Sequence, residues 1–279
     1  MIDREATVQE LIGILINYLP GLADQASDFS KDYIAQRALL RGLMNMHSQK
    51  NQLPDRFFAL QDKLLQYELS QKSIVKADSL KSVLANKKIS IYEGDLTALD
   101  TDVLVNVAAP NLLGCMQAGH DCVDNNIHSC AGLQLRFECA SIMQDNLAPY
   151  GGAVMTSAYN LPCRAIIHAV APTVTFEPKD SDLEAMRQCY IKALDLCVSN
   201  RYRTIALPTL VTGRFGTAVT KLVKTAVDVV QAYLEKTHND LKVIFCPQKV
   251  QEKNAYVNLL TPHEEKRGEL HPFFNINLF

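Results

Sequence analysis

Apolar and polar positions follow two different periods along this chain. Five apolar runs are rich in β-branched residues and are typical of buried strands. They cover residues 89–92, 102–107, 165–170, 203–210 and 242–247. The stretches 181–200 and 217–236 instead repeat apolar residues every three or four positions, which predicts helices. Strands that alternate with helices predict an α/β fold with a mostly parallel sheet covered on both faces, and ligands of such sheets bind beyond the carboxyl ends of the strands.

The first 80 residues show the helical period alone. Three amphipathic stretches, 6–19, 30–46 and 54–69, are predicted as helices, and Pro54 suits the first turn of the third. Short helices cannot bury their apolar faces by themselves. We therefore expect this segment to pack on the part of the chain that follows.

These patterns divide the chain into an N-terminal helical segment at 1–80, a sheet domain at 81–262 and a C-terminal tail at 263–279. Within the sheet domain, Ser181 and Glu184 have the spacing of a capping box, which predicts the start of a helix. The tail is polar and then apolar. Three of its side chains are expected to dock on the body of the protein: Phe273, Phe274 and Phe279.

Composition and charge narrow the class of protein. Hydrophobic residues make up 48% and charged residues 21% of the 279 residues, as in an ordinary globular protein, and the net charge is −2. No basic block indicates a nucleic-acid or membrane-surface binder. The acidic N-terminus and the lack of an apolar run of about 18 residues predict neither a secretory signal nor a membrane span. Because the eight cysteines occur in a long chain rich in apolar residues, we expect reduced thiols and a cytoplasmic protein.

One group of side chains indicates metal chemistry. Cys115, His120 and Cys122 form a C-x4-H-x-C arrangement shortly after a predicted strand. Thiolate and imidazole are favoured zinc ligands, and a site with three protein ligands usually keeps its fourth position open for water or substrate. Cys130 or Cys139 could supply a fourth sulfur, as a structural zinc site requires. The spacing equally allows two buried cysteines and a loop histidine with no metal.

Two other histidines lie inside predicted elements. His128 belongs to a predicted helix over 124–139, so we expect it to pack and form hydrogen bonds rather than bind a metal. His168 lies within the predicted strand 165–170 and is expected to be a core histidine.

Several motifs together resemble the macrodomain, an ADP-ribose-binding module. They are IYEGDLTALDTDVLVNVAAPNLLGCMQAGHDCVDNNIHSCAG, GGAVMTSAYNLPCRAIIHAV and ALPTLVTGRFG. The C-x4-H-x-C insertion resembles the zinc-dependent branch found in bacteria and fungi, which also has an N-terminal segment similar to RALLRGLMNM and LPDRFFALQDKLL here. The resemblance extends over nearly all of residues 35–260. It implies a three-layer α/β/α sandwich with a mostly parallel mixed sheet, preceded by the helical segment.

The resemblance also implies roles for individual residues. Asp95, in the GDLT segment, would accept a hydrogen bond from the adenine amino group, with help from the Leu96 backbone. Asn106 and Asp124 would stand beside the distal ribose as the catalytic pair. The implied zinc ligands are Cys115, His120 and Cys122. The other implied contacts to ADP-ribose come from Cys122, Val123, Val211, Thr212, Gly213, Arg214 and Phe215. In the loop at 211–216, glycine lets the backbone approach the diphosphate, and a helix start at Thr217 adds a favourable dipole.

The implied activity is zinc-dependent removal of mono-ADP-ribose from a protein side chain, which we expect to be a carboxylate. Zinc would polarise a ribose hydroxyl or its bound water, and Asp124 would orient or deprotonate the attacking group. The resemblance further implies a sirtuin-type ADP-ribosyltransferase and a lipoyl-carrier protein similar to the glycine-cleavage H protein as partners. No nucleic acid or membrane partner is expected.

The sequence departs from the family pattern at the ribose segment, and rival interpretations follow. Ala109 replaces the second asparagine of the segment that begins at Asn106, and Asn111 could substitute if the loop bends. Val211 stands where a serine is common, and Arg214 where a small or acidic residue is often found. One alternative is a macrodomain that binds ADP-ribose without cleaving it and holds zinc as a structural clip. Another is a hydrolase with Cys122 as its nucleophile, for which no histidine is convincingly placed as the base.

Overall fold

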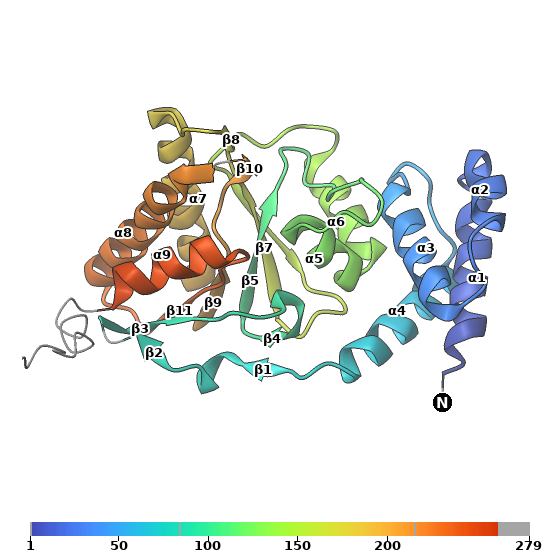
Figure 1. The fold of residues 1–279 in the computed structure, drawn as a ribbon, viewed down its shortest axis with the longest axis horizontal. Coiled ribbons are helices and arrows are strands. Elements are labelled where there is room, and N and C mark those ends of the chain that lie inside the picture. The colour runs from blue at the N-terminus through green and yellow to red at the C-terminus, as the bar shows by residue number, and fades with distance from the viewer. Residues whose placement is uncertain (1, 84, 215, 262–279) are drawn as a thin grey trace, which may run out of the picture.

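The computed structural model describes residues 2–83, 85–214 and 216–261. A mixed sheet carries helices on both faces, and a separate helical layer lies at the N-terminal end (Figure 1). The predicted α/β architecture with its N-terminal helical segment is confirmed. The predicted tail, with Phe273, Phe274 and Phe279, lies outside the described residues. Within the described ranges, no helix is long and apolar enough to cross a membrane.

The central sheet has seven strands, and all five predicted strands belong to it. In spatial order they are β2 (Ser82–Val83), β3 (Asn86–Ile91), β11 (Lys242–Phe245), β9 (Thr204–Leu207), β5 (Val103–Ala108), β7 (Ala165–Val170) and β6 (Ala153–Ser157). The two edge strands, β2 and β6, run antiparallel to their neighbours, and the others are parallel. The prediction that one strand extends to residue 210 is wrong, because β9 ends before Pro208, which has no N–H for the ladder.

Two short parallel pairs lie outside the central sheet. They are β1 (Val75–Lys76) with β4 (Leu99–Asp100), and β8 (Thr173–Thr175) with β10 (Thr212–Arg214). Single 3-10 turns connect several elements: η1 (Pro20–Leu22), η2 (Ala77–Ser79), η3 (Leu96–Ala98) and η4 (Gly216–Ala218). These elements are only two or three residues long, which is too short for a periodic sequence pattern to predict them.

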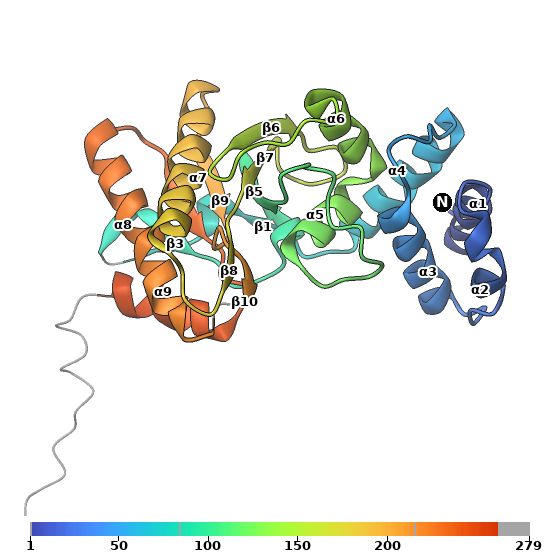
Figure 2. The ribbon, with the colours of Figure 1, turned by 90° about the horizontal axis from the view of Figure 1, so that it is seen from above.

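Helices cover the two faces of the sheet unequally (Figures 1 and 2). One face carries α5 (Val123–Ala131) and α6 (Leu133–Met143), and the other carries α7 (Asp180–Ser199), α8 (Val219–Thr237) and α9 (Val250–Leu260). Alternate side chains of a strand point to opposite faces. Leu104 and Ile166 therefore belong to the core under α5 and α6, while Val105 and Ile167 belong to the core under α7, α8 and α9.

The N-terminal segment forms its own layer beside α5 and α6 (Figure 2). Its helices are α1 (Arg4–Ile16), α2 (Ala23–Ser27), α3 (Tyr33–Met46) and α4 (Asp55–Ser70). They enclose a third apolar core, with Leu11, Leu40 and Phe57 among its buried members. Leu133, the first residue of α6, also belongs to this core. The helical segment therefore packs on the sheet domain through α6, as its exposed apolar faces required.

Three predicted helix boundaries need correction. The capping box at Ser181 and Glu184 is wrong, because α7 begins at Asp180 and its reciprocal contact runs from the Lys179 N–H to Asp182 at 2.9 Å. The helix predicted from residue 217 begins two residues later as α8, after the turn η4. Pro54 is the residue that precedes α4 and lies outside its first turn.

The helix predicted over 124–139 is in fact two helices. Gly132 separates α5 from α6, with a φ of +102° that L side chains rarely adopt. A Cβ at this position would lie 2.5 Å from the amide nitrogen of Gln61 in α4. The break lets α6 turn away from α5 and contact the N-terminal layer.

Candidate functional site

Three segments that carry predicted site residues meet at one edge of the sheet. The parallel strands β3, β5 and β9 all end at this edge, which we call the carboxyl edge. Asp95 follows β3, the loop 109–122 follows β5, and the segment 208–214 follows β9. The sheet topology thus brings together positions that are more than 100 residues apart in the sequence.

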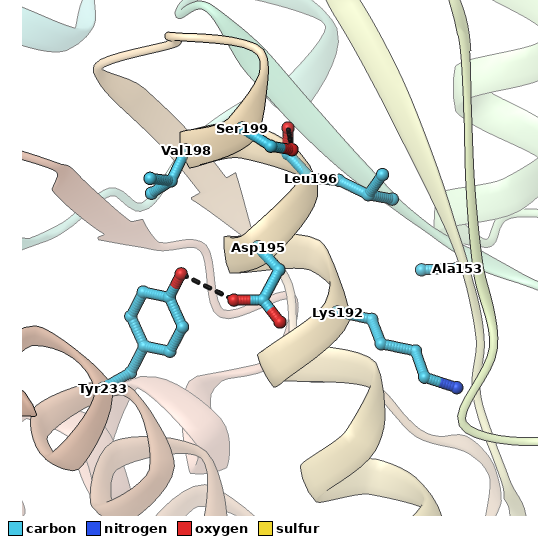
Figure 3. A pocket seen from close by; sticks show the side chains of 7 residues that line it. All are labelled: Ala153, Lys192, Asp195, Leu196, Val198, Ser199 and Tyr233. Carbon is cyan, nitrogen blue, oxygen red and sulfur yellow. Dashed lines mark hydrogen bonds between the residues drawn. The ribbon is translucent and has the colours of Figure 1, made fainter. Parts of the chain in front are cut away.

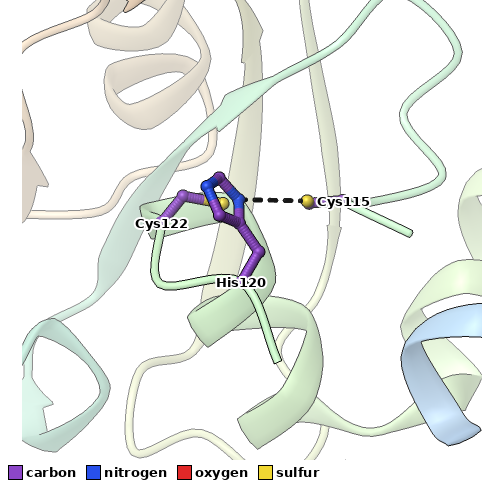
Figure 4. A group of neighbouring side chains, drawn as sticks. All are labelled: Cys115, His120 and Cys122. Carbon is purple, nitrogen blue, oxygen red and sulfur yellow. Dashed lines mark hydrogen bonds between the residues drawn. The ribbon is translucent and has the colours of Figure 1, made fainter. Parts of the chain in front are cut away.

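The loop 109–122, called here the thiol loop, gathers the predicted metal ligands. One ligand atom each of Cys115, His120 and Cys122 lies within 4.8 Å of the other two. The Cys115 sulfur lies 3.4 Å from His120 Nδ1, and Figure 4 shows the three side chains pointing toward one another. Ligands bound tetrahedrally at zinc distances have a sulfur–nitrogen separation of about 3.6 Å. The donor set and its spacing therefore fit a single metal ion.

The same three donors leave one coordination position without a side chain. In the described part of the chain, the group contains no fourth histidine, cysteine or carboxylate ligand. Cys139, considered above as a fourth sulfur, belongs to a separate buried group with His128 and His168. Cys130 belongs to neither group. A tetrahedral ion held here would thus take its fourth ligand from another kind of group, such as a water molecule or a substrate oxygen.

The electrostatics of the thiol loop favour a cation between the two sulfurs. Burial, together with a negative charge on Cys115, raises the pKa of the Cys122 thiol to about 12. The backbone N–H of Asn125 opposes this rise by donating to Cys122 Sγ at 3.3 Å at the start of α5. Two adjacent thiolates at neutral pH therefore require a compensating positive charge.

Asp124 and Asn106 form one hydrogen-bonded unit behind the thiol loop. Asn106 in β5 donates from Nδ2 to Asp124 Oδ1 at 2.7 Å, and both residues are buried. The same amide nitrogen lies 3.1 Å from His168 Nδ1 in β7. An amide N–H can only donate, so His168 Nδ1 is the acceptor and the ring proton is on Nε2, 3.0 Å from Thr156 Oγ1. His168 is therefore the core histidine predicted above, and it also orients Asn106.

The remaining polar atoms of this unit indicate where a ligand would bind. Asn106 Oδ1 is buried and has no hydrogen-bond partner among the residues that the structure describes. Burial raises the pKa of Asp124 to about 6, although the hydrogen bond from Asn106 opposes the rise. An unpaired buried acceptor and a carboxyl group that titrates near neutral pH are features of a binding or catalytic site.

His128 packs as predicted but does not form the expected hydrogen bonds. Both ring nitrogens are buried without a hydrogen bond in the described ranges, and Nε2 lies 3.5 Å from Asp124 Oδ1. Burial lowers the pKa of His128 well below its usual value, so the ring is neutral. A Cβ at Gly114 would lie 2.7 Å from Cγ of this ring. His128 therefore packs against both the carboxyl group of Asp124 and the backbone of the thiol loop.

The neutral state of His168 predicts a pH dependence of stability. Burial lowers its pKa from 6.5 to about 4, so only the unfolded chain binds this proton between those pH values. Stability must then fall as the pH falls from 6.5 to 4, and we expect the loss from His168 to be about 2 kcal/mol between pH 7 and pH 5. Urea denaturation of metal-free protein at both pH values measures it. Between pH 7 and pH 5, the unfolding free energy of the His168→Gln variant should fall by about 2 kcal/mol less than that of wild type. An equal fall in both proteins would contradict the neutral, buried state assigned to His168.

Asp95 occupies a site that is already structured. Its Oδ1 accepts hydrogen bonds from the backbone N–H and hydroxyl of Thr97, at 2.8 and 2.6 Å, and Oδ2 pairs with Lys72 at 2.8 Å. Burial opposes ionisation of Asp95, but the bonds from Lys72 and Thr97 outweigh it and lower the pKa of the carboxyl group. The side chain is half exposed, and Leu96 beside it is buried. Lys72 is a partner that sequence reasoning missed, because it follows α4 in the N-terminal segment.

The predicted diphosphate loop is fixed to the neighbouring strand. Gly213 has a φ of +99°, and a Cβ there would lie 2.3 Å from the carbonyl oxygen of Val174 in β8. The need for glycine thus comes from the pairing of β10 with β8 as well as from any ligand. Val211 is buried and Thr212 is half-buried. The side chain of Arg214 and the whole of Phe215 lie outside the described structure.

The other predicted contacts lie at the base of this region. Val123 is the first residue of α5 and packs against the cores on both faces of the sheet. Asn111, which could substitute for the asparagine missing at Ala109, is exposed in the turn after β5. Its Oδ1 accepts a hydrogen bond from the Leu113 N–H at 3.1 Å and stabilises the turn.

A separate hollow of about 530 Å³ lies against α7 and α8 (Figure 3). Tyr233 donates a hydrogen bond to Asp195 at 2.8 Å on its wall. None of the predicted site residues lines it. The hollow is therefore distinct from the carboxyl-edge site.

Sequence reasoning also missed a buried arginine behind the thiol loop. Arg136 in α6 donates from Nε to the carbonyl of Leu113 at 2.7 Å, and from Nη1 to those of Met44 and His47. Burial lowers its pKa to about 10, so the guanidinium stays charged at neutral pH. The signal in the sequence is a basic residue directly between two apolar ones, Leu135 and Phe137.

Comparison with known proteins identifies the class to which this fold and site belong. A model of the Macro domain family matches residues 105–226. The protein-ADP-ribose hydrolase of Treponema medium is 35% identical over 214 residues, which cover 75% of this chain and 82% of that protein. The protein-ADP-ribose hydrolase of Staphylococcus aureus (strain MSSA476) is 36% identical over 212 residues, with 74% and 78% covered. The chain belongs to the macro domain family.

A solved structure agrees with this assignment. The Trypanosoma brucei macrodomain in complex with ADP-ribose superposes with a TM-score of 0.61 at 25% identity, and the match covers 76% of this chain and 92% of that one. The mixed sheet flanked by helices is thus a macrodomain fold, as the sequence motifs predicted. The helices α1 to α4 precede it as an additional layer.

Proposed function

We propose that this protein is a zinc-dependent hydrolase that removes ADP-ribose from a modified protein side chain. The observation that carries the proposal is the convergence of Cys115, His120 and Cys122 next to the buried pair of Asn106 and Asp124. The relatives named protein-ADP-ribose hydrolase support the same reaction class. The reaction breaks the bond between the anomeric carbon of the distal ribose and a side-chain oxygen, and water supplies the hydroxyl group that the sugar gains.

The protein's own residues divide the work as follows. Asn106 Oδ1, which is buried and unpaired within the described residues, can accept a hydrogen bond from a ribose hydroxyl. Asp124, held by Asn106, can take a proton from the attacking water, which is the role of a general base. The leaving side chain departs as a carboxylate, so it requires no proton.

The three donors of the thiol loop would hold the zinc ion. A bound zinc ion supplies Lewis-acid polarisation of an oxygen ligand, and lowers the pKa of a bound water to about 7 in favourable sites. The lack of a fourth protein ligand in the described group supports a catalytic over a structural ion. Asp95 would bind the adenine amino group, in which case the ligand competes with Lys72 for Oδ2.

Ala109 supports a second candidate, a macrodomain that binds ADP-ribose without cleaving it. The segment that begins at Asn106 ends in Ala109, which forms no side-chain hydrogen bond, and Asn111 already serves a turn. Each lost hydrogen bond at the ribose would cost about 0.5–1.5 kcal/mol. In this alternative the zinc ion stabilises the loop only.

The finer features of the substrate are also part of the proposal. We propose an acidic side chain as the modified residue, on a lipoyl-carrier protein similar to the glycine-cleavage H protein, with a sirtuin-type transferase as the enzyme that attaches ADP-ribose. The cytoplasm, where thiols stay reduced, suits the free cysteines of the thiol loop.

Zinc removal tests the proposal directly. Protein purified with zinc should release ADP-ribose from a mono-ADP-ribosylated carrier protein, and chelation should reduce the rate by about 100-fold or more, because a metal ion contributes several kcal/mol to such a transition state. Adding zinc back should restore the rate. Equal rates with and without chelator would refute the metal-dependent mechanism. No release by the zinc-loaded protein, with ADP-ribose binding retained, would favour the non-catalytic alternative.

A further inference from the structure

The N-terminal helix α3 makes direct contacts with the thiol loop. Arg41 donates from Nη2 to Asn126 Oδ1 at 2.6 Å and to the carbonyl oxygen of His120 at 3.4 Å. Its Nη2 and Nε also donate to Asn125 Oδ1, at 2.8 and 3.2 Å. One guanidinium therefore binds both a ligand residue of the loop and the first turn of α5.

A second residue on the same face of α3 holds the middle of the loop. Asn45 lies one helical turn after Arg41 and is buried. Its Oδ1 accepts a hydrogen bond from the Gly119 N–H at 3.0 Å, and its Nδ2 donates to Ser129 Oγ in α5 at 3.1 Å. Between them, a Cβ at Gly42 would lie 3.5 Å from the Ala118 side chain. The loop thus rests on α3 over the stretch that precedes His120.

Asn125 transmits the contact from Arg41 to the ligand residues. Because Arg41 donates to its Oδ1, its Nδ2 must face the thiol loop, where it donates to the carbonyls of Cys115 and Gln117 at 3.3 and 3.0 Å. Ser129 donates to the same Oδ1 at 3.1 Å. Asn125 is fully buried. If its amide were reversed, its NH2 group would face the donors of Arg41 and Ser129, and its oxygen would face the two carbonyls.

The loop needs such support because its own backbone is not in regular secondary structure. Between β5 and α5, three residues have positive φ: Leu112, Gly114 and Gly119. A loop without regular backbone hydrogen bonding loses conformational entropy when a metal brings its three ligands together. This loss is smaller if contacts from outside the loop already hold it in place.

We propose that Arg41 and Asn45 are positioning residues, and that the N-terminal helical segment preorganises the thiol loop for metal binding. The inference rests on the proposed function, since it assumes that the loop binds zinc. It gives the helical segment a role in the site itself, beyond covering an apolar face of α6. Changes to residues of this kind around a metal typically reduce affinity by about 10–100-fold.

The experiment compares zinc affinity by chelator competition in the full-length protein and three variants. Arg41→Ala should weaken zinc binding by about 10–100-fold, and Arg41→Lys, which retains charge but loses the planar fork, should weaken it less. Arg37→Ala is the matched control, because Arg37 lies one turn earlier on α3 and pairs with Glu68 in α4 at 2.6 Å. Its zinc affinity should equal that of wild type. ADP-ribose affinity of the metal-free Arg41→Ala protein should also be unchanged, a result that general unfolding would not produce.

The outcomes separate the two proposals. If the Arg41→Ala protein binds zinc as tightly as wild type, the positioning role of Arg41 is overturned and the proposed function still stands. Equal weakening in Arg37→Ala also overturns it, since the effect is then one of helix stability. Should Arg41→Ala fail to fold, wild-type affinity in Arg41→Lys overturns the role. A wild-type protein that binds no zinc removes both proposals together.

Discussion

Replacing His120 by alanine is expected to abolish zinc binding and lower kcat by on the order of 10³-fold, because the ion's several kcal/mol of transition-state stabilisation is lost. His120 is the best ligand to remove. Its side chain is exposed, and its imidazole nitrogen contacts the Cys115 sulfur. Cys122 also caps α5, so Cys122→Ala would combine ligand loss with helix destabilisation. Metal analysis of the purified variant and release of ADP-ribose from a modified carrier protein measure the two effects.

Two control variants make the result specific. His238→Asn removes an exposed histidine at the end of α8, where asparagine tolerates the left-handed backbone, and should retain zinc and turnover. Asp95→Asn retains a side-chain acceptor for Thr97 but loses the charge at the predicted adenine site. It should raise KM for the substrate about tenfold and leave zinc content unchanged. Full turnover by the His120→Ala protein would refute the assignment of this residue as a ligand.

Asp124→Asn should lower kcat by about 10²–10⁴-fold while zinc content and ADP-ribose affinity stay near wild type. Asparagine has nearly the same shape, and its carbonyl oxygen can still accept the hydrogen bond from Asn106 Nδ2. What it loses is the capacity to take a proton. Single-turnover kinetics with calorimetric measurement of ADP-ribose binding would separate the chemical step from affinity.

A different outcome would identify a different role for Asp124. If Asp124→Asn lowers zinc content, the carboxyl group acts through the metal loop rather than on water. If kcat is unchanged, another group takes the proton and the assignment of the base is wrong. The thermal stability of the variant provides the control, because a neutral side chain at a site with so strongly raised a pKa should not destabilise the fold.

The sequence was most informative where a pattern repeats over many residues. The apolar runs at 102–107 and 165–170 identified β5 and β7, because a strand buried on both faces requires continuous apolar residues. The edge strand β6 was not predicted, since Ala153–Ser157 has half-buried and exposed positions and only five residues. The break at Gly132 was also missed, because the apolar period continues across it while only the backbone φ changes.

The site was predictable only in its local part. Cys115, His120 and Cys122 lie within eight residues of each other, so their proximity follows from the sequence itself. The contacts from Arg41 and Lys72 span 79 and 23 residues, and no spacing rule links such positions. The pairing of Asn106 with His168 depends on the register between β5 and β7, which a list of strands does not contain.

The buried guanidinium of Arg136 has a consequence for how the two parts of the chain depend on each other. Two of its three acceptor carbonyls, those of Met44 and His47, come from the helical segment, and the third, Leu113, comes from the thiol loop. Removing the helical segment would take away two of the three acceptors and also part of the cover that keeps this side chain buried. The boundary near residue 80 therefore marks a change of architecture, and we expect the helical segment and the macrodomain to unfold in a single transition.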